Sequence, residues 1–177
     1  MKLDRDRAAL VVVDVQEAFR KAVPSFAEIA GATGTLVQGA AKIGIPVVVT
    51  EQYPKGLGAT APEVAEHLPA GVEPIAKTCF SAAEADGFDL GGRDQAIVCG
   101  IETHVCVNQT VLDLVATGIE VHVVSDAVGS RTRENRELGL HRAEQAGAIL
   151  TSVETALFEL LRNAQAPEFK EVQGLVR

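Results

Sequence analysis

Cys106 has the residue type and the chain position that nucleophilic thiol chemistry requires. It stands at the first turn of a predicted helix, six residues after an apolar run that ends at Gly100. Backbone N–H groups at a helix N-terminus lack intrahelical partners and carry a positive partial charge, so they stabilise a thiolate and can donate to a substrate oxyanion. Cys106 is therefore a candidate nucleophile, and a buried, inert cysteine is the alternative interpretation.

Two charged residues also follow apolar runs. Asp14 comes directly after Ala9–Val13, and Lys77 follows a short run that ends at Ala76. A carboxylate at the end of a buried strand is unfavourable unless it is paired or hydrogen-bonded, so Asp14 either holds a loop or serves as a base beside Cys106. Apolar neighbours around Lys77 favour a partly buried ammonium, which would lower the pKa of an adjacent carboxylate or thiol.

The elements that must position these residues are predicted from the alternation of short apolar runs with longer segments of helical period. Strands are expected at Ala8–Asp14, Ile45–Thr50, Glu73–Ala76, Gln95–Gly100, Glu120–Ser125 and Ala148–Thr151. Helices are expected at Ser25–Ile43, Glu63–His67, His104–Thr117, Arg131–Gln145, Ser152–Asn163 and Pro167–Gln173. The pattern predicts an α/β fold, with a six-stranded parallel sheet in a three-layer αβα arrangement and the strand order 3-2-1-4-5-6.

The predicted strand order brings the candidate residues together. The first and fourth strands are neighbours in this order, so their carboxyl ends border one crevice. Asp14 and the turn from Gly100 to Cys106 should therefore face each other, which strengthens the interpretation of Cys106 as a nucleophile.

The length and the charge of the chain limit its partners. Its 177 residues suit a single domain over 1–177, and a net charge of −8 without a basic stripe argues against nucleic acid and anionic membranes as partners. No apolar stretch approaches the ~20 residues that cross a bilayer, and the charged N-terminus lacks the layout of a secretory signal. Three cysteines without a CxxC pair argue against a disulfide framework or structural zinc, so we expect a reducing cytoplasm.

Three separated motifs follow one another along the chain: Val12–Phe19, Lys77–Ser81 and Gly100–Leu114. Together they resemble the isochorismatase-like cysteine hydrolases, and the resemblance covers nearly the whole chain. Within that family, the segments Val49–Gly58, Gly100–His104 and Ser125–Arg131 are most similar to the isochorismatase domain-containing subgroup. The resemblance implies a fold of the isochorismatase-like hydrolase type.

The resemblance also implies a catalytic triad of Asp14, Lys77 and Cys106. In the amidases of the family the thiolate attacks an amide carbonyl, the Asp carries the proton to the departing amine, the Lys balances the charge, and water then hydrolyses the thioester. A cis peptide bond between Ile101 and Glu102 is implied as well. It would direct the N–H of Glu102, together with the N–H of Cys106, at the oxyanion.

Two departures from better known members narrow the expected reaction. The segment Thr50–Gly58 lacks the metal-binding histidines of nicotinamidases, and His67 is a lone histidine, so we expect no metal, no cofactor and a substrate other than nicotinamide. Isochorismatases proper cleave a vinyl ether and generally lack the nucleophilic cysteine, whereas Cys106 is present here. The expected reaction is hydrolysis of a small amide, carbamoyl or related acyl compound.

Five residues near the carboxyl ends of the strands are expected around a small-molecule substrate: Gln16, Phe19, Tyr53, Thr103 and His104. For Phe19 and Tyr53, core packing is the alternative. Arg131 and Arg133 favour surface or interface ion pairs, and anion binding by them stays open. The resemblance implies a homo-oligomer, either a dimer or a tetramer, and the apolar residues of the C-terminal tail also need a surface that covers them.

Two other functions stay open. One is a module that binds a small ligand or a protein without turnover. The other is a redox role in which Cys79 resolves an oxidised Cys106, which requires their Cα atoms to lie within about 7 Å. Cys99 ends an apolar run and is expected to be an inert core residue. The intact set of Asp14, Lys77 and Cys106 favours the enzyme.

Overall fold

Six parallel strands form one sheet in the computed structural model, which describes residues 1–177. The order β3-β2-β1-β4-β5-β6 confirms the predicted order and the α/β class. The strands are β1 (Ala8–Val13), β2 (Val47–Gln52), β3 (Ile75–Lys77), β4 (Gln95–Ile101), β5 (Glu120–Gly129) and β6 (Ile149–Thr151). Val13, the last residue of β1, pairs with Thr50 on one side and with Gly100 on the other. The carboxyl ends of the central strands therefore lie together at one edge of the sheet.

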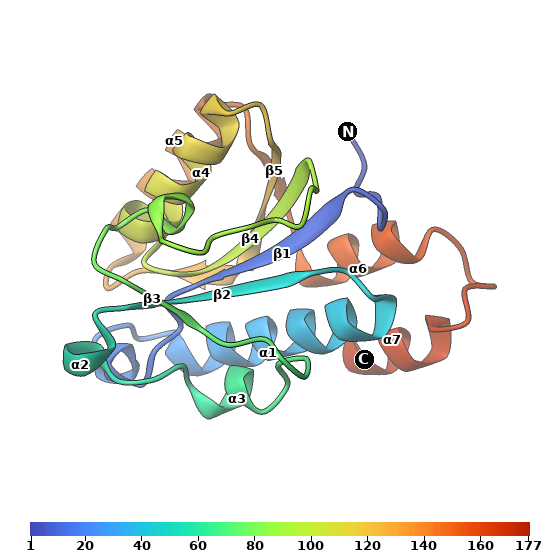
Figure 1. The fold of residues 1–177 in the computed structure, drawn as a ribbon, viewed down its shortest axis with the longest axis horizontal. Helices are drawn as coiled ribbons and strands as arrows, with labels where there is room; N and C mark the ends of the chain where they lie inside the picture. Colours follow the sequence, from blue (N-terminus) through green and yellow to red (C-terminus); the bar gives the residue numbers. More distant parts are fainter.

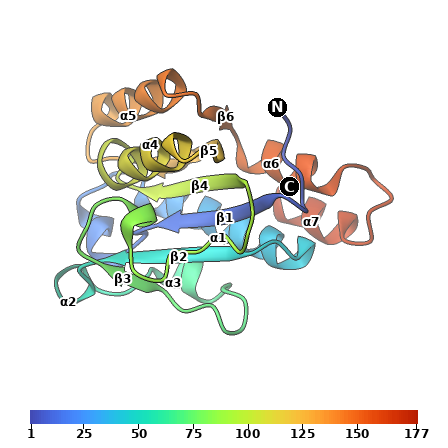
Figure 2. The same cartoon turned by 45° about the horizontal axis from the view of Figure 1, so that its top comes forward.

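Helices cover both faces of this sheet, as the predicted three layers require (Figures 1 and 2). One face carries α1 (Phe26–Ile43), α3 (Pro62–Ala65), α6 (Val153–Leu161) and α7 (Phe169–Leu175), and the other carries α4 (Asn108–Ala116) and α5 (Arg133–Gln145). Alternate residues of β1 point to the two layers: Val12 joins the core cluster beneath α1, and Val11 joins the cluster beneath α4. No helix combines the length and the hydropathy that crossing a membrane requires.

Short helical turns connect these elements near the carboxyl edge of the sheet. They are η1 (Glu17–Lys21), α2 (Pro54–Leu57), η2 (Ala82–Glu84) and the π-helical turn η3 (Thr103–Val107). The sequence predicts one helix from His104 to Thr117, but the structure divides this segment into η3 and α4. The N–H of Val107 donates to the carbonyl of Glu102, five residues earlier, which gives η3 its wider turn. A turn this short has no period that the sequence pattern could reveal.

The C-terminal tail packs on its own chain. Val172 of α7 is completely buried in the core cluster beneath α1, and Phe169 and Val176 pack against the same cluster. An ion pair between Lys42 of α1 and Glu171 of α7 joins the two helices. The apolar residues of the tail are thus covered within the chain, so the tail gives no support to the expected oligomer.

Gly100 marks a close approach between β4 and β1. A Cβ atom at this position would lie 2.0 Å from the carbonyl oxygen of Val13, and the φ of 123° is one that L side chains rarely adopt. Gly100→Ala should therefore lower the free energy of unfolding by about 2 kcal/mol or more in urea denaturation. Gly31 is the matched control, because nothing lies within 4 Å of a Cβ there. Gly31→Ala in α1 should stabilise the fold by roughly 0.5–1 kcal/mol, and equal effects of the two changes would contradict the close approach.

Candidate functional site

Asp14 is the first residue beyond β1, and it is fully buried. Its φ of 52° turns the chain out of the strand direction. The hydroxyl of Thr50 donates to one carboxylate oxygen at 2.7 Å, and the ammonium of Lys77 donates to the other at 2.8 Å. Residues of β2 and β3 therefore hold the Asp14 carboxylate at the carboxyl edge of the sheet.

Lys77 ends β3, and only 1% of its side chain is exposed. Besides Asp14, its Nζ donates to Gln52 Oε1 at 2.7 Å and to the carbonyls of Cys79 and Phe80 at 3.2 and 3.0 Å. Removing two charges from water is unfavourable, and a buried ion pair persists where additional hydrogen bonds satisfy its members. The Lys77 side chain is thus held by acceptors from β2 and from the segment after β3, in addition to Asp14. It cannot turn toward solvent without losing these hydrogen bonds.

Cys106 lies in η3 and is buried. Its carbonyl accepts a hydrogen bond from the hydroxyl of Thr110 at 2.7 Å, and this hydroxyl accepts one from the N–H of Ala82 at 2.8 Å. Thr110 therefore joins the turn that carries the thiol to the segment that follows Lys77. Hydrogen bonds therefore connect the segments that carry Asp14, Lys77 and Cys106.

Burial raises the pKa of the Cys106 thiol to about 12. The negative charge of Asp14 acts in the same direction, while the positive charge of Lys77 opposes it. The predicted lowering of this pKa is wrong, because desolvation of the thiolate outweighs the attraction of the lysine. A base must therefore take the proton when this thiol reacts at neutral pH.

The peptide bond between Ile101 and Glu102, just before η3, is cis. The N–H of Glu102 donates to no acceptor within the protein, so it remains available as a hydrogen-bond donor. The Glu102 carboxylate accepts hydrogen bonds from the N–H and the Nε of Arg131, at 2.9 and 3.1 Å. Arg131 thus forms an ion pair within the chain and holds the Glu102 side chain in place.

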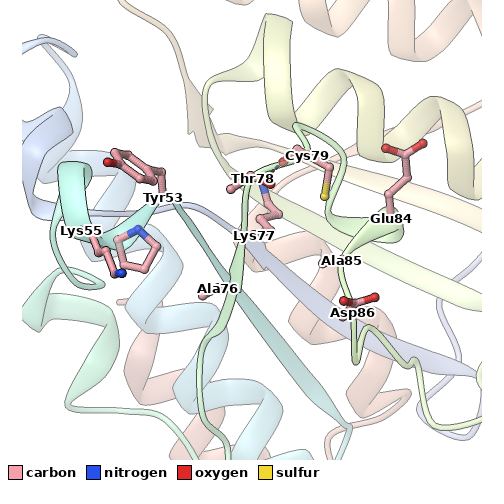
Figure 3. Close-up of a pocket in the computed structure, with 10 residues that line it drawn as sticks. Tyr53, Lys55, Ala76, Lys77, Thr78, Cys79, Glu84, Ala85 and Asp86 are labelled. Carbon is pink, nitrogen blue, oxygen red and sulfur yellow. Dashed lines mark hydrogen bonds between the residues drawn. The ribbon is translucent and has the colours of Figure 1, made fainter.

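A cavity of about 570 Å³ adjoins this cluster on the β3 side. Figure 3 shows Tyr53 and Lys55 on one side of β3 and Cys79, Glu84 and Asp86 on the other, with Lys77 between them. Asp14 and Cys106 do not line the cavity, which reaches the cluster only at Lys77. No sequence motif marks Glu84 or Asp86, whereas Lys55 stands within the segment Val49–Gly58 and Cys79 stands within the motif that begins at Lys77.

Only Tyr53 of the five residues predicted around the substrate lines this cavity. Gln16 is buried, and its amide bonds to backbone groups of Gln52 and Gly58, so it fixes the loop after β2. Phe19 packs against the core cluster beneath α1. Both residues follow β1 on the loop, but their side chains turn into the protein instead of toward the cavity.

Thr103 and His104 belong to η3 and do not line the cavity beside Lys77 either. The hydroxyl of Thr103 is buried without a hydrogen-bond partner. The Nδ1 of His104 lies 3.1 Å from the hydroxyl of Ser130, at the end of β5. His104 therefore contacts the β5 side of the site, and no hydrogen bond joins it to Cys106.

The three cysteines are all free. Cys99 is fully buried in β4, and burial raises its pKa to about 12, as expected of an inert core residue. Cys79 is half-buried, and its Sγ lies 3.4 Å from the carbonyl oxygen of Ser81. No group of three or more His, Cys, Asp or Glu side chains is arranged to hold a metal ion.

The strand order is that of an isochorismatase-like hydrolase fold. The model of the isochorismatase domain matches residues 8–155. The chain therefore belongs to the isochorismatase family, as its motifs predict.

Relatives extend this assignment over nearly the whole chain. Isochorismatase domain-containing protein 2A of Mus musculus is 39% identical, and the match covers 97% of this chain and 84% of that protein. The structure of MAR1 ribonuclease from Caenorhabditis elegans is 42% identical with a TM-score of 0.96, over 99% of this chain and 92% of that one. The YcaC gene product of Escherichia coli, described as an octameric hydrolase of unknown specificity, is 25% identical with a TM-score of 0.84. The match covers 99% of this chain and 95% of that one. The predicted subgroup is confirmed, and the family supports a hydrolase function.

Proposed function

We propose that the chain is a cysteine hydrolase that cleaves a small amide, carbamoyl or related acyl compound through a thioester on Cys106. The observation that carries this proposal is the buried 2.8 Å pair of Lys77 and Asp14, whose carboxylate influences the pKa of the Cys106 thiol. Charged side chains are almost never fully buried without a partner or a use, and perturbed pKa values gather at functional sites. Membership of a hydrolase family gives this cluster a matching chemistry.

The raised pKa of Cys106 determines the first step. The thiol is protonated at neutral pH, so Asp14 takes its proton while the bond between Sγ and the carbonyl carbon forms. The carbonyl π electrons move onto oxygen, and the N–H groups of Glu102 and Cys106 hold this oxyanion. Lys77 positions the Asp14 carboxylate and compensates its charge until the proton arrives.

The remaining steps return the proton and the thiol. Collapse of the oxyanion breaks the C–N bond, and Asp14 gives its proton to the departing amine. Water then attacks the thioester and gives a proton to Asp14. The C–S bond breaks, the proton returns to Cys106, and the carboxylic or carbamic acid leaves. Neither a metal nor a cofactor takes part in the proposed reaction.

The cavity beside Lys77 could hold the part of a small polar substrate that does not react, since Cys106 does not line it. Its volume of about 570 Å³ lies within the range of small-molecule sites. Lys55 lies on one side of β3 and Glu84 and Asp86 lie on the other, so the lining of the cavity carries charges of both signs that can orient polar groups (Figure 3). The exposed ring of Tyr53 adds an aromatic surface at the mouth.

We also propose that residues 1–177 act as one domain and that the chain forms a homo-oligomer, either a dimer or a tetramer. The octameric state described for the E. coli relative supports self-association in this fold. On the surface of this chain, Tyr53 after β2 and Phe80 after the edge strand β3 are exposed aromatic residues. Sedimentation velocity would determine the number of subunits.

RNA is the alternative substrate that the relatives raise, because one of them is named a ribonuclease. RNA binding relies on Lys and Arg side chains that neutralise phosphates. This chain has a net charge of −8, and Glu84 and Asp86 line the cavity beside Lys77. The charges therefore favour a small acyl compound over RNA.

A substrate screen tests the proposal. Small primary amides and carbamoyl compounds are incubated with the protein, and released ammonia is measured, with Cys106→Ala as the inactive control. Cys79→Ala is the matched second control, because Cys79 lines the cavity and its side chain plays no part in the proposed steps. We expect ammonia release that is lost only in Cys106→Ala. Binding of the amides without turnover would support the binding module, and cleavage of RNA that survives Cys106→Ala would overturn the proposal.

The pKa of Cys106 gives a prediction about alkylation by iodoacetamide. The alkylation rate of Cys106 should rise about tenfold for each pH unit between about pH 7 and 10. Below a pKa of about 12, the fraction of thiolate rises about tenfold with each pH unit. Asp14→Asn removes the negative charge that raises this pKa, so alkylation at a fixed pH should become faster while hydrolysis is lost. Mass spectrometry of peptides measures the rates, with buried Cys99 as the slow internal reference. Slower alkylation in Asp14→Asn would contradict the proposed arrangement.

A further inference from the structure

A second polar cavity lies on the opposite side of the sheet's carboxyl edge from β3. We name it the arginine pocket; it has a volume of about 280 Å³ and is lined by Pro24, Ser25, Ser130, Arg131, Thr132, Arg133 and Arg136. It lies where the end of β5 and the beginning of α5 meet the beginning of α1, and it shares no lining residue with the cavity beside Lys77. In a chain with a net charge of −8, the pocket is a local concentration of positive charge.

Two of the three arginines already have carboxylate partners. Arg131 pairs with Glu102 at 3.1 Å, and Arg133 pairs with Glu137 one helical turn further along α5 at 2.6 Å. Both guanidinium groups remain largely exposed, with 58% and 84% of their side chains accessible. Arg131 and Arg133 make the electrostatic potential of the pocket more positive, and each keeps a carboxylate partner that compensates its charge.

Arg136 is different, because it is half-buried and forms no ion pair. Its Nε donates to the carbonyl of Val128 at 3.1 Å, and one terminal nitrogen donates to the carbonyl of Ser125. These two carbonyls fix the plane of the guanidinium, but they carry no net charge. A guanidinium has five N–H donors, so three remain for another acceptor. A partly buried cation in a fixed orientation, with free donors, is suited to bind an anion.

We propose that the arginine pocket binds a small oxyanion group, such as phosphate, sulfate or carboxylate, with Arg136 as its main ligand. The planar fork of a guanidinium matches two oxygens of such a group. Ser25 offers a further donor, because its hydroxyl forms no capping hydrogen bond to α1. The group is either a free inorganic anion or the charged end of an organic molecule, and both present the same oxygens to Arg136.

Isothermal titration calorimetry with inorganic phosphate, at constant ionic strength, tests this site on the full chain. Arg136→Gln should weaken phosphate binding by at least about tenfold, because it removes the charge and the fork. Arg142→Gln is the matched control: Arg142 is an exposed residue of the same helix outside the pocket, and its loss should change binding by less than about twofold. Circular dichroism shows whether each variant is folded. If Arg136→Gln does not fold, Arg136→Lys and Ser25→Ala replace it, and both should weaken binding.

One further ligand, methyl phosphate, identifies the source of the anion. Methyl phosphate that binds as tightly as phosphate indicates the charged end of an organic molecule, whereas binding of phosphate alone indicates a free anion. Either result supports the site. The absence of saturable binding, or equal affinities for wild type, Arg136→Gln and Arg142→Gln, would overturn it. Because the measurement needs no turnover, its outcome does not depend on the proposed hydrolase reaction.

Discussion

Replacing Lys77 by methionine should lower the free energy of unfolding by about 3–5 kcal/mol and abolish hydrolysis. The change keeps an unbranched side chain but removes the ammonium that pairs with the fully buried Asp14 carboxylate. The hydroxyl of Thr50 would remain as the only side-chain donor to that carboxylate. One neutral donor does not compensate a buried negative charge. Urea denaturation followed by circular dichroism measures the loss.

Lys55→Met is the matched control for this prediction. Lys55 lines the same cavity as Lys77, but it is exposed, so its replacement should change stability by less than about 0.5 kcal/mol. Asp14→Asn gives a second comparison, because Lys77 would keep its hydrogen bonds to Gln52 Oε1 and to two carbonyls. Its destabilisation should therefore be smaller than that of Lys77→Met. If Lys77→Met were as stable as the wild type, the buried ion pair would be wrong.

Replacing Cys106 by alanine should reduce kcat/KM on a substrate from the amide screen by at least about a thousandfold. Alanine fills most of the volume of the side chain in the buried turn η3 but has no nucleophilic atom. The fold should persist, with a stability change of about 1 kcal/mol, because only one small buried group is lost. Steady-state ammonia release and urea denaturation measure the two effects.

Cys106→Ser separates the nucleophile from the shape of the site. A hydroxyl at this position is a far weaker nucleophile than a thiol toward the same base, so Cys106→Ser should also lose most of the activity. Cys79→Ala should keep it within about threefold, since the only hydrogen bond of this side chain goes to the carbonyl of Ser81. Activity that is equal in Cys106→Ser and the wild type would exclude covalent thiol catalysis.

Much of the fold could be predicted because its central strands are buried on both faces. β1 and β4 are unbroken buried runs, which limits them to the middle of a parallel sheet. The same topology places Asp14, after β1, and Lys77, at the end of β3, on one edge of the sheet with β2 between them. The location of these two residues at strand ends could therefore be predicted from the sequence pattern, whereas their contact across β2 was implied only by the family resemblance.

The environment of the thiol could not be predicted in the same way. A helix N-terminus and a nearby lysine both lower a thiol pKa, and the sequence contains both signals. The structure places Cys106 within a π-helical turn and buries it, so desolvation determines the direction of the shift. How deeply a side chain is buried depends on packing between segments, and residue spacing does not encode it.

The residues around the cavity were the least predictable part of the site. Gln16 and Phe19 follow β1, just before and within the short turn η1, where no period fixes the direction of a side chain, and both point into the protein. Glu84 and Asp86 lie between β3 and β4, in a segment without a motif. Their place in the cavity depends on the path of the whole loop.

The most direct test of the proposed thioester is to find the acyl group on Cys106 during turnover. The enzyme is quenched with acid while it hydrolyses a substrate from the amide screen, and it is then digested with trypsin. The tryptic peptide Asp94–Arg131 contains both Cys99 and Cys106, so fragment spectra must distinguish them. We predict the acyl mass on Cys106 and none in Cys106→Ala. Turnover that continues in Cys106→Ala, with no acyl group on Cys106 of the wild type, would contradict the proposed mechanism.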